Sequence, residues 1–253
     1  MRINSLSLEN YRNIIRCDLT PGEGVNLIVG DNAQGKTNLM EAIWLLTGEK
    51  TFRYGREHDI PRLDMDRETQ RTRVYANVFA EGRDQELEYI LWPRRQVKIN
   101  GITEPGRGAF SGKLCCVIFS PNHLSLVRDG PAERRDFLDG AICQLRPQYI
   151  KVLSDYNRAL AQRSTLLREA FRDRGRLDLL PVFDYHVARL GSLIQVTRQS
   201  YLTRLAEYAA GFHQGISAGK EELSVRYTIG GTGSGILDPE GSREGLEQAL
   251  LSL

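Results

Sequence analysis

The chain carries one stretch of eight residues whose types and spacing could hold a phosphate. Residues 30–37 read GDNAQGKT and fit the pattern G-x-x-x-x-G-K-[ST]. In such a loop, backbone N–H groups surround the β-phosphate, together with the N-terminus of the helix that follows. Lys36 would reach the β- and γ-phosphates, and the hydroxyl of Thr37 would ligate Mg²⁺. The pattern predicts a nucleotide-binding loop formed by Gly30, Asp31, Asn32, Ala33, Gln34, Gly35, Lys36, Thr37 and Asn38.

The segments on either side of the loop are those that the motif requires. Residues 25–29 form a short apolar run, which predicts a buried strand. Residues 38–46 contain no helix breaker, and Leu39, Ile43 and Leu46 fall on one helical face. Strand, loop and helix therefore follow one another in the expected order.

The second half of an ATPase centre is harder to find. Phosphoryl transfer needs an acidic residue, usually at the end of another strand, to hold the metal or orient water. The best apolar run for that strand, residues 114–119, is followed by Ser-Pro-Asn-His and has no carboxylate at its end. Gly-rich residues 230–235 could present a helix N-terminus to a γ-phosphate, but the Ile-Leu-Asp-Pro that follows is typical of a turn. We therefore assign no catalytic residue and expect nucleotide binding without hydrolysis.

Composition sets broad limits on the class of protein. The 253 residues are 41% apolar and 26% charged, which is typical of one large globular domain or two smaller ones. No stretch approaches the length of a membrane span, and the N-terminus does not resemble a signal peptide. The net charge of +2 gives no overall basic field. Four cysteines lack metal-ligand spacing and are predicted to be reduced core residues of a cytoplasmic protein: Cys17, Cys115, Cys116 and Cys143.

The pattern along the chain predicts three regions. Residues 1–125 are β-rich around the phosphate loop, with alternating strands near 3–8, 74–80 and 87–91 and a tight Asn-Gly hairpin over 97–102. Residues 126–215 are helical. Helices begin at Pro131 and Pro147, and a third, over 183–212, pairs with the second as an antiparallel hairpin. Residues 216–253 form a return segment with a strand over 223–228, a Gly-rich loop over 230–241 and a short terminal helix.

Two separated motifs resemble those of one family. Residues 10–13, NYRN, followed by GDNAQGKTNLMEAI at 30–43, resemble the opening of the RecF family. Residues 119–139, FSPNHLSLVRDGPAERRDFLD, resemble its F-x-P-E-D-L-x-L-V-x-G-x-P-x-x-R-R-x-F-L-D element. They depart from it at Asn122 and His123, where acids are usual. In addition, either an extra residue precedes the Gly-Pro pair or Arg128 and Asp129 are the variable positions of the element. RecF proteins are ABC-type ATPases related to SMC proteins, and they assist loading of RecA recombinase at gapped DNA.

The resemblance implies a fold and a function. The fold would be α/β, an ABC-type P-loop NTPase lobe with an antiparallel β-meander, plus a helical lobe containing a long helical hairpin. The cofactors would be ATP and Mg²⁺, with ATP held between two copies in a head-to-tail dimer. The partners would be single- and double-stranded DNA at gaps or junctions, RecR and RecO, within DNA repair, recombination, replication and the SOS response. It also implies that the signature and Walker B motifs lie beyond residue 253.

Three arginines acquire candidate roles on this reading. Arg12, in the first motif, could approach the nucleotide or could hold a structural turn. Arg134 and Arg135, in the second, are candidates for DNA binding or for ion pairs on the helix surface, where Glu133 and Asp136 flank them.

Two other functions remain open from the sequence. A P-loop kinase for a small substrate would share the phosphate loop, but about 29 residues precede the loop here and no Asp ends the next strand. An architectural SMC-like head would need long coiled-coil arms. The two long helices are expected to have about 28 to 32 residues, or about 42 to 48 Å at 1.5 Å per residue, which makes a lobe rather than arms.

Overall fold

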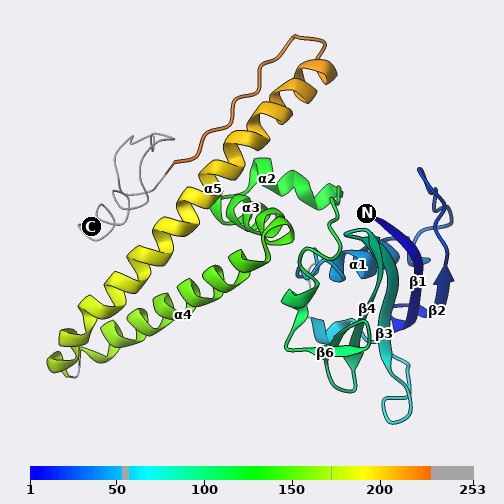
Figure 1. Ribbon diagram of the computed structural model, residues 1–253, viewed down its shortest axis with the longest axis horizontal. Coiled ribbons are helices and arrows are strands. Elements are labelled where there is room, and N and C mark those ends of the chain that lie inside the picture. The colour runs from blue at the N-terminus through cyan, green and yellow to red at the C-terminus, as the bar shows by residue number, and fades with distance from the viewer. Residues whose placement is uncertain (53–56, 172, 229–253) are drawn as a thin grey trace. The chain divides into compact units, whose positions relative to one another are not determined.

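The computed structural model describes residues 1–52, 57–171 and 173–228 (Figure 1). The chain divides into two compact units, which are described separately. Unit 1 comprises Met1–Glu133 with Cys143–Pro147, and unit 2 comprises Arg134–Ile142 with the chain from Gln148 onward. The three-region division expected from the sequence remains a prediction, and the expected Gly-rich loop and terminal helix lie outside the described residues.

Unit 1 is built on an antiparallel sheet of six strands in the order β2-β1-β3-β4-β5-β6. The strands predicted near 3–8, 74–80 and 87–91 are confirmed as β1, β3 and β4. The Asn-Gly hairpin is confirmed as well, because Asn100 and Gly101 both have positive φ, at 51° and 78°. The strands are β1 (Arg2–Tyr11), β2 (Ile14–Leu19), β3 (Thr72–Ala80), β4 (Arg83–Trp92), β5 (Gln96–Ile99) and β6 (Ile102–Glu104).

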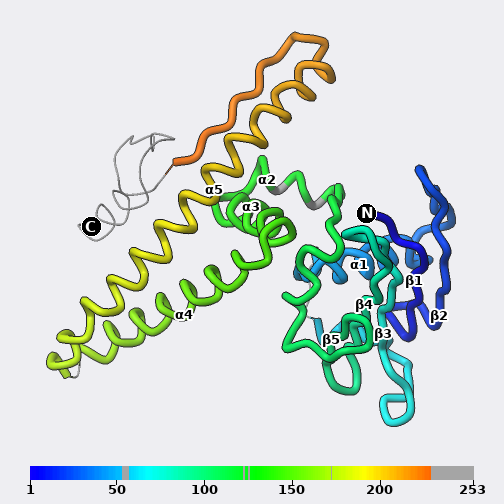
Figure 2. The backbone as a smooth tube through the Cα atoms, viewed as in Figure 1, coloured from blue at the N-terminus to red at the C-terminus, as the bar shows by residue number. Residues whose placement is uncertain are grey.

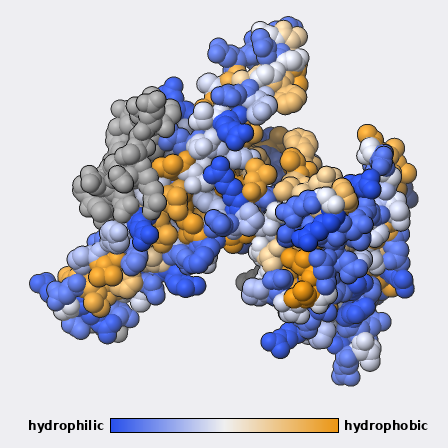
Figure 3. All heavy atoms as spheres, in the orientation of Figure 1, coloured by the Kyte–Doolittle hydropathy of each residue, from blue (hydrophilic) through white to orange (hydrophobic). Residues whose placement is uncertain are grey.

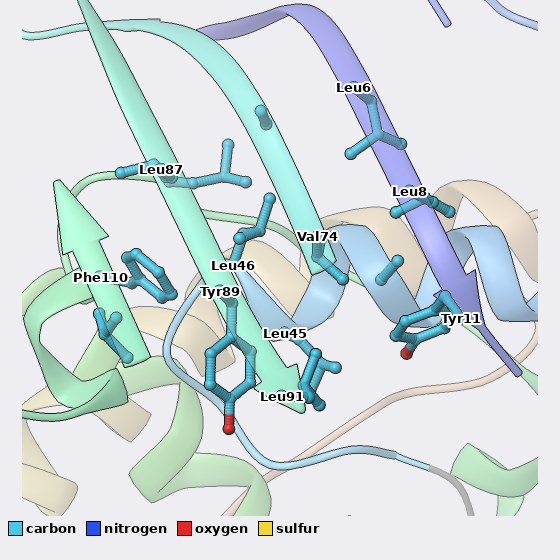
Figure 4. Close-up of a cluster of buried hydrophobic side chains, with 14 of the residues drawn as sticks. Leu6, Leu8, Tyr11, Leu45, Leu46, Val74, Leu87, Tyr89, Leu91 and Phe110 are labelled. Atoms are coloured by element: carbon cyan, nitrogen blue, oxygen red, sulfur yellow. The ribbon is translucent and has the colours of Figure 1, made fainter. Parts of the chain in front are cut away.

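The core of unit 1 lies between one face of this sheet and helix α1 (Lys36–Leu45) (Figure 4). Alternate residues of a strand point to the same face, so the paired residues Leu8, Val74 and Tyr89 are buried together. Leu39 and Leu45 of α1 belong to the same cluster. The phosphate loop is therefore held at the N-terminus of a helix that is packed against the sheet. Short helical turns complete the unit: η1 (Glu57–Asp59), η2 (Arg107–Phe110), η3 (Pro121–Leu124) and α2 (Ser125–Arg128).

Two predicted strands are wrong for the described chain. Residues 25–29 and 114–119 are in extended or irregular conformation and form no ladder with any strand of the sheet. Several of their apolar side chains are open to solvent, with Val25 97% and Val117 98% exposed, whereas Leu114 is buried in the core of unit 1. A strand needs a neighbour to accept its backbone hydrogen bonds, and neither segment has one within the part of the chain described here. The strand expected at 223–228 is not formed either.

Unit 2 contains the predicted antiparallel helical hairpin, formed by α4 (Pro147–Glu169) and α5 (Leu180–Ile216) (Figure 2). A short turn, η4 (Arg174–Leu179), joins them, and α3 (Pro131–Leu145) packs beside them. The predicted helix lengths are wrong, since α4 has 23 residues and α5 has 37. Packing of the long helix does not extend to its C-terminal end, where Tyr208 and Phe212 of α5 are 67% and 73% exposed. Apolar surface is visible along the hairpin in Figure 3.

A polar network joins the three helices of unit 2. The carboxylate of Asp139 on α3 accepts hydrogen bonds from Nε and Nη2 of Arg198 on α5, at 2.7 and 2.6 Å. It also accepts one from the hydroxyl of Tyr149 on α4, at 2.8 Å. Burial raises the pKa of Tyr149, and the nearby Asp139 charge acts in the same direction. The Asp139 carboxylate therefore links α3 to both α4 and α5 by hydrogen bonds.

Candidate nucleotide-binding site

The phosphate loop has the backbone shape that a phosphate site requires. Gly30, Ala33 and Gly35 have φ angles of 152°, 66° and 102°, so the chain repeatedly enters conformations that L-residues rarely adopt. Such alternation turns successive N–H groups toward one side and creates an anion-binding concavity. A Cβ at Gly35 would also lie 2.8 Å from Oδ1 of Asn13, so the Asn13 side chain would have to move. The positive φ therefore favours glycine at the position that precedes α1, and a larger residue there would also displace Asn13.

Helix α1 begins directly after the loop and presents a free N-terminus. In this fully described helix, no acidic residue lies in the first turn, and no side chain caps the N-terminus. The N–H groups of the first turn therefore have no competing intramolecular anion, and the helix dipole favours negative charge at this position. The hydroxyl of Thr37 is in this first turn, and the residue is exposed.

Lys36 folds back over the loop. Its Nζ donates to the carbonyl oxygens of Gly30 and Asp31 at 2.6 and 2.7 Å. An ammonium group held by two neutral carbonyls can exchange them for charged phosphate oxygens, which bind it more strongly. The side chain therefore already lies over the concavity where a β- or γ-phosphate would bind.

Arg12 lies on the turn between β1 and β2 and faces the side of α1. Its Nε and Nη2 donate to the two carboxylate oxygens of Glu41, at 3.0 and 2.7 Å, and its Nη1 donates to the Asp59 carbonyl at 3.1 Å. Glu41 is fully buried and also accepts from the hydroxyl of Thr51. Burial acts to raise the pKa of Glu41, but the hydrogen bonds from Arg12 and Thr51 and the Arg12 charge hold it below its usual value. This geometry supports the structural alternative for Arg12, and its contact with nucleotide stays a prediction.

Asn13, which the sequence analysis left without a role, contacts the loop directly. Its Nδ2 donates to the Ala33 carbonyl at 2.7 Å, and its Oδ1 accepts from Nδ2 of Asn38 at 2.7 Å. The one available signal was its place in the motif NYRN, next to Arg12. Sequence spacing could not connect residue 13 with residues 33 and 38, because the β1–β2 turn meets the loop only in three dimensions.

The DNA-binding candidates lie elsewhere in the fold. Arg134 and Arg135 are exposed in the first turns of α3 and belong to unit 2, whereas the phosphate loop belongs to unit 1. Their contact with DNA stays a prediction.

In the described part of the chain, no group of three or more His, Cys, Asp or Glu side chains is arranged to hold a metal ion. No helix in those same ranges has the length and hydropathy of a membrane span.

Comparisons with known proteins agree on one family. The family model for an AAA ATPase domain matches residues 1–99. The "DNA replication and repair protein RecF" of Acetivibrio thermocellus is 35% identical over 229 residues, which cover 90% of this chain and 61% of that protein. The protein of the same name from Symbiobacterium thermophilum is 35% identical over 254 residues, covering 100% of this chain and 66% of that protein.

Solved structures agree as well. "Structure of the recombination mediator protein RecF-ATPrS in RecFOR pathway" superposes with a TM-score of 0.85 and 30% identity, over 99% of this chain and 67% of that one. The chain belongs to the RecF family. A second RecF structure, described as RecF-ATP, matches with a TM-score of 0.85 and 29% identity. The predicted α/β fold, an ABC-type P-loop lobe with an antiparallel sheet and a helical part, is therefore confirmed. The chain spans about three fifths of the first RecF relatives, 61% and 60% of their lengths.

Proposed function

We propose that this chain is the ATP-binding part of a RecF-type mediator of DNA repair and recombination. The geometry around Lys36 carries the proposal: its Nζ lies 2.6 and 2.7 Å from two loop carbonyls, at the uncapped N-terminus of α1. The names of the two similar structures, RecF-ATPrS and RecF-ATP, support ATP as the nucleotide.

The residues present fit both ATP and Mg²⁺. Backbone N–H groups of residues 33–38 would bind the β-phosphate, and Lys36 would leave the Gly30 and Asp31 carbonyls for phosphate oxygens. The exposed hydroxyl of Thr37, in the same turn, would be a ligand of Mg²⁺. The metal would supply positive charge that offsets the negative charge of the bound phosphates.

Binding without hydrolysis is the second part of the proposal. Hydrolysis needs a carboxylate that orients water or holds the metal, together with donors for the charge that develops in the transition state. Residues 114–119, the best candidate for the strand that would present such an acid, are followed by no carboxylate up to His123. We infer that the chain forms the ground-state complex with ATP but lacks the groups for turnover.

DNA and protein partners follow from family membership. DNA at gaps or junctions would bind the helical lobe through arginines such as Arg134 and Arg135, and RecR and RecO would be the protein partners in assisting RecA loading. These roles, the ATP-dependent dimer, the cytoplasmic location and the link to the SOS response are proposals. The kinase alternative gains no support from the site, and an SMC-like arm would need far longer helices than α4 and α5.

Calorimetric titration of the folded chain with ATP and Mg²⁺ tests the proposal. Saturable binding at one site is expected, with ADP binding the same site. The absence of heat and of a melting shift at millimolar ATP, from a chain with an intact thermal transition, would overturn the assignment.

A further inference from the structure

Ala33 occupies a conformation that must be held by its neighbours. Its φ of 66° lies in the left-handed region, where the Cβ of an L-residue meets backbone atoms. Residues other than glycine persist there only when the surrounding contacts outweigh the strain. Ala33 is exposed, so burial of its methyl group does not provide that compensation.

Asn13 makes the contact that fixes Ala33. A carbonyl oxygen can only accept, so the atom of Asn13 that lies 2.7 Å from the Ala33 oxygen must be the donor, Nδ2. This leaves Oδ1 as the acceptor for Nδ2 of Asn38, also at 2.7 Å. One amide thus bonds both the middle of the phosphate loop and the first turn of α1.

The turn that carries Asn13 is itself firmly anchored. Its neighbour Arg12 is paired with the buried carboxylate of Glu41, and the backbone N–H of Arg12 donates to the Ile60 carbonyl at 2.8 Å. Tyr11, one residue earlier, is fully buried in the core of unit 1. The amide of Asn13 therefore projects from a fixed support, and the loop must adapt to it.

This contact also sets the direction of one N–H group. In a trans peptide the C=O and N–H point in opposite directions. Because the Ala33 carbonyl is tied to Asn13, the N–H of Gln34 is aimed away from Asn13. Without that tie, the peptide between Ala33 and Gln34 could rotate as Ala33 returned to an unstrained conformation.

We propose that Asn13 is a positioning residue of the phosphate loop. It holds Ala33 in the left-handed conformation and aims the Gln34 N–H at the β-phosphate, so it raises affinity for nucleotide phosphates without touching them. The gain is one of preorganisation, because a loop that is already shaped loses less freedom on binding. The inference rests on the proposed binding of ATP at this loop.

Titration of ATP and ADP, each with Mg²⁺, into wild type and Asn13→Ala tests the inference. Asn13→Ala removes both bonds of the amide, and loss of the bond to Ala33 should weaken the binding of both nucleotides by about three- to tenfold, by nearly the same factor for ATP and ADP. Asn13→Asp keeps the acceptor for Asn38 but cannot donate to the Ala33 carbonyl. Its affinity for nucleotide should therefore be as low as that of Asn13→Ala rather than that of wild type. Asn4→Ala is the matched control, since Nδ2 of Asn4 donates to Asn77 and Asp84, at 2.7 and 2.8 Å, rather than to the loop.

Two further readouts separate positioning from general stability. Amide hydrogen exchange of the peptide spanning residues 30–38 should quicken in nucleotide-free Asn13→Ala while the melting temperature stays close to that of wild type. In a double-mutant cycle, Asn13→Ala should cost less affinity in an Ala33→Gly background, because glycine needs no support at positive φ. Wild-type affinity in Asn13→Ala or Asn13→Asp, or strict additivity in the cycle, would overturn the positioning role. Failure of the wild-type chain to bind ATP would instead overturn the proposed function.

Discussion

The guanidinium of Arg12 and the carboxylate of Glu41 form a two-point ion pair, with Nε–Oε2 and Nη2–Oε1 distances of 3.0 and 2.7 Å. The pair joins the β1–β2 turn to the side of α1, the helix that begins at the phosphate loop. It is buried, with Glu41 fully enclosed and the side chain of Arg12 15% exposed. Its two partners are 29 residues apart in sequence, so the pair fixes a long-range junction beside the site.

Glu41→Gln should destabilise the fold. The substitution leaves the buried Arg12 without a counter-charge, and loss of one member of a buried pair typically costs about 3 to 5 kcal/mol. Urea denaturation of wild type and variant would measure the difference in unfolding free energy. Glu23→Gln is the control, because Glu23 is paired with Arg2 on the surface, where a pair contributes about 0 to 1 kcal/mol. Equal small effects of the two substitutions would contradict the buried pair.

The same pair should add a dependence of stability on pH. The pKa of Glu41 is lowered in the folded state from its ordinary value of 4.5. The contribution to stability is therefore fully present above about pH 4.5 and is lost as pH falls through the lower, folded-state pKa. As the pH is lowered from 7, the unfolding free energy of wild type should fall more steeply below about pH 4.5 than that of Glu41→Gln, which lacks the titrating carboxyl group. Parallel curves would mean that the Glu41 carboxyl titrates alike in both states.

Most strands of unit 1 could be predicted from the sequence, because each of them pairs with a neighbouring strand within the described chain. The alternation at 74–80 and 87–91 and the Asn100-Gly101 turn are local signals, and each led to the observed element. The same reasoning failed at 25–29 and 114–119, because an apolar run indicates that a segment suits burial and does not show what would cover it. Asn13 was missed for a related reason, since its contacts with Ala33 and Asn38 depend on how two loops meet.

Lys36→Ala should abolish stabilisation by ATP while leaving the fold intact. Among the described residues, Lys36 bonds to the loop carbonyls of Gly30 and Asp31 and is not part of the core cluster of unit 1. A ligand at a hundred times its dissociation constant stabilises a protein by about 2.7 kcal/mol, so the wild-type melting temperature should rise on addition of ATP. Lys151→Ala, at an exposed position of α4, should keep the shift. An equal shift in Lys36→Ala and wild type would refute the phosphate-loop assignment.

DNA binding should be steeply dependent on salt and insensitive to sequence. The candidate contacts are arginine side chains, and each neutralised phosphate adds about 0.9 to the slope of log K against log salt. If Arg134 and Arg135 both touch phosphate, replacing both with Ala should lower the slope by about two. Replacing Arg2 and Arg16, which form surface ion pairs in unit 1, provides the control. An unchanged slope in the variant that lacks Arg134 and Arg135 would show that neither arginine contacts DNA phosphate.

ATP should bind this chain without being hydrolysed and without causing it to dimerise. Lys36, Thr37 and the N-terminus of α1 suffice for the ground-state complex, but catalysis of phosphoryl transfer depends on groups placed for the transition state. A ligand shifts an association equilibrium only if it binds the dimer better than the monomer. We expect no such preference, because the Gly-rich residues 230–235, which could have faced the γ-phosphate of a partner, are followed by turn residues in the sequence. Steady-state phosphate release and light-scattering mass, with and without ATP, would measure both properties.

The same two measurements on a full-length RecF relative provide the positive control. Turnover of ATP, or an ATP-dependent dimer, of the 253-residue chain itself would show that the chain does contain a carboxylate that acts at the site. Asp184 would be tested first, although its carboxylate is already bonded to Arg163 within unit 2. Asp238, which lies outside the described residues, would be the second. Asp→Asn at each position would then show which carboxylate supports turnover, because asparagine keeps the shape but cannot hold the metal or act as a base.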